Sequence, residues 1–119
     1  MRIIIYDKID HEPITAIKLS RKMMILAKER RILQFYTTQD LDISPYKSGQ
    51  PPREIRRSIV TLRFEPIYKD KEILMWLAYA DDTDAVLSLK SVFLSGQYKA
   101  LNEAKKEAFV HGFFGGLIS

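Results

Sequence analysis

The chain contains no cysteine among its 119 residues. This absence excludes disulfides, thiolate catalysis and cysteine-based metal sites, and it fits a reducing compartment. Long apolar segments are lacking too, since the longest apolar run, residues 73–80, is far shorter than the ~20 residues that span a bilayer. The N-terminal segment reaches charged Asp7 too early for the apolar part of a signal peptide. We therefore expect a cytoplasmic protein with no membrane segment.

Catalytic equipment is also scarce. The two histidines, His11 and His111, have no recognisable orienting partner of the kind that a general base needs, and we expect His111 to be half-buried and structural. Nucleophile-elbow, phosphate-loop and dinucleotide-binding motifs are missing. Asp7 has no carboxylate partners at metal-ligand spacing, so we expect it to be solvated at the end of a strand. The sequence predicts no enzyme, no metal site and no cofactor.

What the chain does contain is an average globular composition. Hydrophobic residues make up 46% and charged residues 29%, which is enough apolar material to form a core and excludes a disordered chain. The length suits one domain, residues 1–119. The formal net charge of +4 is mild, so it permits a nucleic-acid partner without requiring one.

The first half of the chain predicts a strand, a helix and a second strand. Residues 2–6 are β-branched and predict a strand. Asp10 can cap a helix over residues 12–30, followed by a strand over 32–37. A hairpin built from residues 22–27 and 32–37 is the alternative. Residues 38–54 hold three prolines and little periodicity, which indicates a long irregular connection.

The second half predicts two strands and two helices. Residues 58–64 alternate in polarity, as a half-buried strand does, and the apolar run at 73–80 indicates a central strand covered on both faces. Helices are expected at residues 85–94 and 98–113. The order β-α-β-β-β-α-α predicts an α+β fold. Its helices should pack on an antiparallel or mixed sheet of about four strands.

Tyr79-Ala80-Asp81-Asp82 resembles the tyrosine-x-aspartate-aspartate turn of reverse transcriptases. The resemblance implies paired carboxylates that hold two metal ions for nucleotidyl transfer. Capping of the following helix by Asp81, Asp82 or Asp84 explains the same acids without a metal, and this is our preferred interpretation. A metal-dependent nuclease or transferase is therefore the third functional hypothesis.

Arginines gather around the predicted strand at residues 58–64. Guanidinium groups along a strand and the loop before it match the geometry of phosphates or carboxylates, and a loop tyrosine can stack on a base. A solvated sheet edge explains the same charges. The candidate residues for binding nucleic acid or an anion are Arg53, Arg56, Arg57, Arg63 and Tyr46.

The C-terminal segment is apolar, which is unusual because chain ends are mostly polar and frayed. It predicts either a tail packed on its own core or an interface with a protein partner or a second copy of the chain. The candidate interface residues are Phe113, Phe114, Leu117 and Ile118.

Together these features favour a small regulatory or inhibitory protein that binds another protein or itself. Such compact chains without catalytic equipment suit a virus or a mobile element. The alternative hypothesis is a nucleic-acid-binding module that uses the arginine-bearing strand.

Overall fold

The computed structural model describes residues 2–38 and 57–118. They form an α+β fold with a mixed sheet, as predicted, but with five strands where about four were expected. The predicted connection at residues 38–54 lies outside the described residues, apart from Thr38. The elements are β1 (Arg2–Asp7), β2 (Glu12–Lys18), α1 (Arg21–Arg30), β3 (Ile32–Thr38), β4 (Arg57–Lys69), β5 (Glu72–Ala80), α2 (Thr83–Phe93), α3 (Gly96–Lys99) and α4 (Glu103–Phe114).

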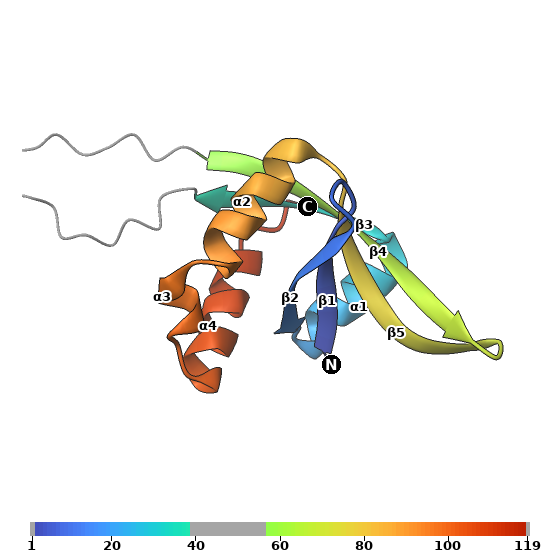
Figure 1. The fold of residues 1–119 in the computed structure, drawn as a ribbon. Helices are drawn as coiled ribbons and strands as arrows, with labels where there is room; N and C mark the ends of the chain where they lie inside the picture. Colours follow the sequence, from blue (N-terminus) through green and yellow to red (C-terminus); the bar gives the residue numbers. More distant parts are fainter. Residues whose placement is uncertain (1, 39–56, 119) are drawn as a thin grey trace, which may run out of the picture.

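The strands lie in the order β2-β1-β5-β4-β3 (Figure 1). Three neighbouring pairs are antiparallel, and the central pair, β1 with β5, is parallel. The β4–β5 hairpin turns at Asp70 and Lys71, which both have positive φ. Positive φ at both central residues is the geometry of a two-residue hairpin turn whose twist matches the strands.

The predicted helix over residues 12–30 is wrong in its first half, because residues 12–18 form β2, paired with β1. The register of that pair shifts between Ile5 and Tyr6, so β2 carries a bulge. As a result Ile14 and Ile17 are both buried although they lie three residues apart. That spacing imitates the periodicity of a helix.

Within the range predicted as one helix, only residues 21–30 are helical. The alternative prediction, a hairpin with a strand at residues 22–27, is therefore also wrong. The hydroxyl of Ser20 accepts the backbone N–H of Met23 and caps α1. Arg31 ends the helix with φ 65°, and its guanidinium lies 4.7 Å from the centre of the Trp76 ring. Near the C-terminus the single predicted helix is likewise divided, into α3 and α4, because Asn102 caps a new helix there.

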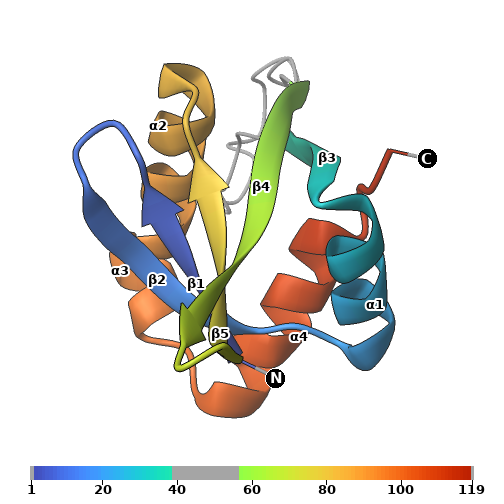
Figure 2. The same ribbon diagram turned by 90° about the vertical axis from the view of Figure 1, so that its right-hand side faces the viewer.

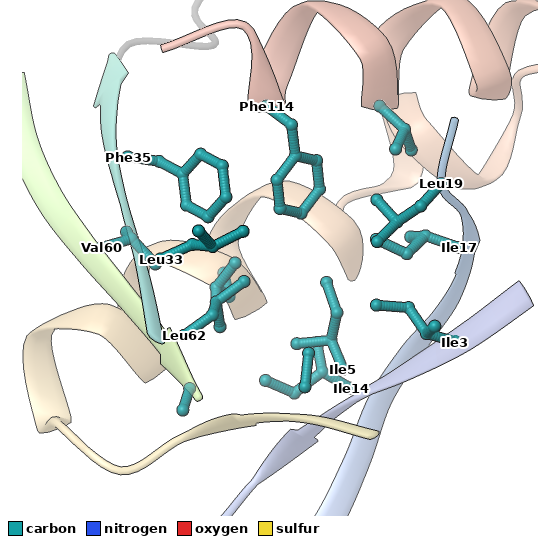
Figure 3. Close-up of a cluster of buried hydrophobic side chains, with 14 of the residues drawn as sticks. Ile3, Ile5, Ile14, Ile17, Leu19, Leu33, Phe35, Val60, Leu62 and Phe114 are labelled. Atoms are coloured by element: carbon teal, nitrogen blue, oxygen red, sulfur yellow. The ribbon is translucent and has the colours of Figure 1, made fainter. Parts of the chain in front are cut away.

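The four helices of the described residues pack on the same face of the sheet and share its core. Figure 2 shows α2, α3 and α4 behind the sheet and α1 at its right-hand side. Alternate strand residues point toward the helices and form one core with them, including the side chains of Ile5, Phe35, Leu62 and Phe114 (Figure 3). None of the helices among the described residues is long and apolar enough to cross a membrane.

Candidate functional site

One face of the sheet carries no helix among the described residues, and it presents many apolar and aromatic side chains. The strand register aligns its side chains in rows, with Ile4 beside Leu77 and Tyr6 beside Tyr79. A neighbouring row places Tyr36 beside Ile59. We call this surface the open face; its apolar and aromatic members include Ile4, Tyr6, Ile32, Tyr36, Ile59, Leu77 and Tyr79.

These side chains are accessible. Ile32, Tyr36 and Ile59 are each about half exposed, at 51%, 49% and 51%. The residues on the central strands β1 and β5 are half-buried by their neighbours in the sheet. The open face therefore presents apolar and aromatic side chains to solvent where the opposite face has helices. Thr61, Arg63 and Glu65 of β4 lie on the same face and separate the apolar group on β3 and β4 from the group on β1 and β5.

Tyr79 lies at the centre of the polar contacts on this face. Its ring meets that of Tyr6 edge to face at 5.7 Å, and the ammonium of Lys8 lies 4.7 Å from the ring centre. Burial, with a smaller contribution from the negative charge of Glu65, raises the pKa of Tyr79 above its ordinary value. Its hydroxyl therefore stays neutral at physiological pH and acts as a hydrogen-bonding group.

The charges around Tyr79 balance one another. Arg63 lies beside Tyr79 in the register, and its guanidinium is 3.6 Å from a carboxylate oxygen of Asp81. Glu65 lies beside Leu77 on the same strand as Arg63. With Lys8 this makes two positive and two negative side chains in the immediate surroundings of Tyr79.

Among the arginine candidates, Arg63 has an ion pair and strand neighbours within the described residues. Arg57 begins β4 opposite Thr38. Arg53, Arg56 and Tyr46 lie outside the described residues. The structure thus places Arg63 on the open face, in an ion pair whose two members are both about half exposed.

The C-terminal candidates lie against their own chain. Phe114 is 2% exposed and packs on Phe35, with ring centres 4.7 Å apart. The ring of Phe113 packs on that of Phe93, with ring centres 5.3 Å apart.

The last residues of the tail pair with β3 through their backbone. Leu117 forms an isolated antiparallel β-bridge with Phe35. The N–H of Ile118 donates to the carbonyl of Gln34 at 2.9 Å. The tail therefore covers the outer edge of β3, and Phe114 belongs to the core.

A cluster of charged residues lies where β1 ends. Asp7 is fully buried and not solvated as expected, because Lys90 of α2 reaches it. The Lys90 ammonium is 2.8 Å from Asp7, 3.3 Å from Asp10 and 2.8 Å from Glu12. The other oxygen of Asp7 accepts the N–H groups of Ile9 and Asp10 and holds the turn that leads to β2.

This cluster has the donor set of a cation site, since ligand atoms of Asp7, Asp10 and Glu12 lie within 4.8 Å of one another. The ammonium of Lys90 contacts all three carboxylates and already supplies the positive charge. Hydrogen bonds to Asp7 and then Glu12 raise the pKa of Lys90, and the bond from Lys90 lowers that of Asp7 despite its burial. Lys90 therefore links α2 to the β1–β2 turn through three carboxylates.

The acids of the Tyr79–Asp82 segment have separate structural partners. Asp82 caps α2, as predicted, by accepting a hydrogen bond from the N–H of Ala85 at 3.0 Å, and Asp81 pairs with Arg63.

The two histidines lie on other segments of the chain. His11 is in the β1–β2 turn with φ 55°, and His111 is exposed on α4, not half-buried as expected.

Sequence reasoning missed both Lys90 and the open face. Lys90 lies 83 positions after Asp7, and a single lysine on a helix gives no signal of its partner. The open face did leave a signal, the uninterrupted apolar run at residues 73–80. That run was expected to be covered on both sides.

No protein-family model matches the chain, and no curated protein or solved structure matches it.

Proposed function

We propose that this is a non-catalytic binding protein, regulatory or inhibitory, that docks on another protein through the open face. The observation that carries the proposal is the one-sided placement of the helices, which leaves apolar and aromatic side chains of β1, β3, β4 and β5 uncovered. Exposed apolar patches with polar residues beside them usually mark an interaction site. The cytoplasm stays the expected compartment.

The size of the face suits a protein partner. Five strands at ~4.8 Å spacing are about 24 Å wide, and six paired residues add about 20 Å of length. The flat area is then on the order of 500 Å² before side-chain relief is counted, which approaches the ~800 Å² per partner of a standard interface. Tyrosines, isoleucines and Leu77 supply its apolar contacts, and Arg63 and Glu65 beside Tyr79 and Leu77 supply polar contacts, as protein interfaces combine both kinds.

Nucleic acid is the second candidate, favoured by one observation. Tyr6 and Tyr79 lie side by side on neighbouring strands with Lys8 and Arg63 close by, and aromatic rings on an open sheet are platforms for stacked bases. The balanced charge around Tyr79 weighs against it, because binding to a phosphate backbone depends on an excess of positive charge. A protein is therefore the preferred partner.

The test is capture of partners from an extract of the cells that make the protein. A face variant, Ile32→Glu with Ile59→Glu, is compared with a control, Ile25→Glu with Leu87→Glu, whose positions on α1 and α2 are equally exposed or more so. A third variant carries Lys in place of Glu at residues 32 and 59. We expect wild type and control to retain the same protein at high salt, and both face variants to lose it.

The lysine variant separates the two candidates. A nucleic-acid surface would keep or gain binding with added lysines, and nuclease treatment would release what it holds. Either result, or identical capture by all four proteins, would contradict the proposal.

A further inference from the structure

A hollow lies on the helical side of the molecule, away from the open face. It has a volume of about 380 Å³ and lies between α1, the end of β2 and α4. Ligand pockets generally measure ~300–1,000 Å³, so this hollow fits a small molecule at the lower end of the range. It is independent of the docking surface proposed above.

The floor of the hollow is hydrocarbon. Leu19, Val110 and Phe114 contribute to it and are 4%, 3% and 2% exposed, so they are also part of the core and are held firmly. Met23 and Leu26 line the side formed by α1. A floor of this kind offers dispersion contacts and burial to an apolar chain, and it has few hydrogen-bonding groups for a polar ligand.

The rim is basic. Lys18, Lys22 and His111 line it together with one acid, Glu107, whose carboxylate is 3.3 Å from the Lys18 ammonium. That pair leaves the charge of Lys22 unbalanced, because no residue in the described part of the chain forms an ion pair with it. The first turn of α1 also contains no acidic residue. A group that rests on this rim should therefore be negatively charged.

We propose that the hollow binds a small amphipathic anion, an unbranched aliphatic carboxylate whose chain lies on the apolar floor and whose head group meets Lys22. Charge and apolar surface are complementary at the two ends of such a ligand. The volume favours a medium-length chain. Each added methylene that reaches the floor contributes about 0.8 kcal/mol, which corresponds to about fourfold in affinity.

The test uses decanoate as the probe, titrated calorimetrically below its micelle concentration. We expect saturable binding that strengthens about fourfold per methylene from hexanoate to decanoate. Decyltrimethylammonium, with the same chain and the opposite charge, should bind at least tenfold more weakly. Absence of saturable decanoate binding, or equal binding of the cation, would overturn the proposal.

Two variants test the placement. Lys22→Glu reverses the unpaired charge and should weaken decanoate binding at least tenfold, whereas Lys105→Glu, exposed on α4 outside the hollow, should leave it unchanged. Leu26→Trp should fill the hollow from its α1 side and weaken decanoate binding, and circular dichroism verifies that the fold persists. Equal effects of the two charge reversals would contradict the assignment. So would a concentration-dependent dimer that excludes decanoate, since a second copy would then cover the hollow.

Discussion

Asp7 and Lys90 show how one buried residue can decide a local structure. Asp7 fixes the β1–β2 turn through one carboxylate oxygen and holds α2 through the other. An acid that is completely buried is tolerated only when it is paired and hydrogen-bonded. Asp7 has both an ion pair with Lys90 and hydrogen bonds from the turn, so it links α2 to the β1–β2 turn.

The lowered pKa of Asp7 predicts an acid-sensitive contribution to stability. Because the folded-state pKa lies below the ordinary value of 3.8, the stabilisation is complete above that value and is lost as the pH falls through the folded-state pKa. We expect the free energy of unfolding of wild type, measured by urea titration, to fall steeply below about pH 4.

Asp7→Asn provides the comparison. This variant should be less stable than wild type at pH 7, because Lys90 loses its buried partner, and its stability should change less below about pH 4. Asp70→Asn, in the exposed β4–β5 turn, is the control and should follow the wild-type profile. Parallel profiles for wild type and Asp7→Asn would show that Asp7 is not the titrating group.

At the scale of elements, the sequence predicted the strands better than the first helix. Residues 58–64 alternate and residues 73–80 are continuously apolar, and both segments form strands in the sheet. β2 was missed because Asp10 was predicted to cap a helix over residues 12–30, whereas it lies in the β1–β2 turn. The bulge in β2 also buries Ile14 and Ile17 together, at a spacing typical of a helix. A bulge depends on the pairing with β1, and no pattern within residues 12–18 alone reveals it.

The C-terminal tail depends on a close approach to β3 that only glycine permits. The carbonyl of Gly116 accepts the N–H of Tyr36 at 2.8 Å, and a Cβ at residue 116 would lie 2.3 Å from the Tyr36 carbonyl oxygen. Gly116→Ala should therefore push the tail off the edge of β3 and lower the free energy of unfolding by ~1–3 kcal/mol. Urea denaturation measures the loss, and faster hydrogen exchange at the Tyr36 amide locates it.

Gly112→Ala is the matched control within α4. An added Cβ there meets nothing within 4 Å, so the substitution should be neutral or should stabilise by up to ~1 kcal/mol because alanine favours helix. If Gly116→Ala were as stable as Gly112→Ala, the close contact between the tail and β3 would not exist in solution.

For the whole molecule, the fold class was predictable and the open face was not. Apolar alternation in short segments was enough to indicate a sheet with helices packed on it. The pattern does not say how many faces of the sheet the helices cover, because that depends on the directions in which the connections cross. β5 is central, as expected, but Leu77 and Tyr79 point away from every helix.

Photo-crosslinking tests the central claim most directly, by asking what touches the open face in the cell. A photoreactive phenylalanine derivative replaces Tyr6, which lies on the open face beside Tyr79, or Leu87, which is 61% exposed on α2. We predict a discrete, nuclease-resistant protein adduct from residue 6 and none from residue 87. A nuclease-sensitive adduct from residue 6, or no adduct there at all, would contradict docking of a protein on this face.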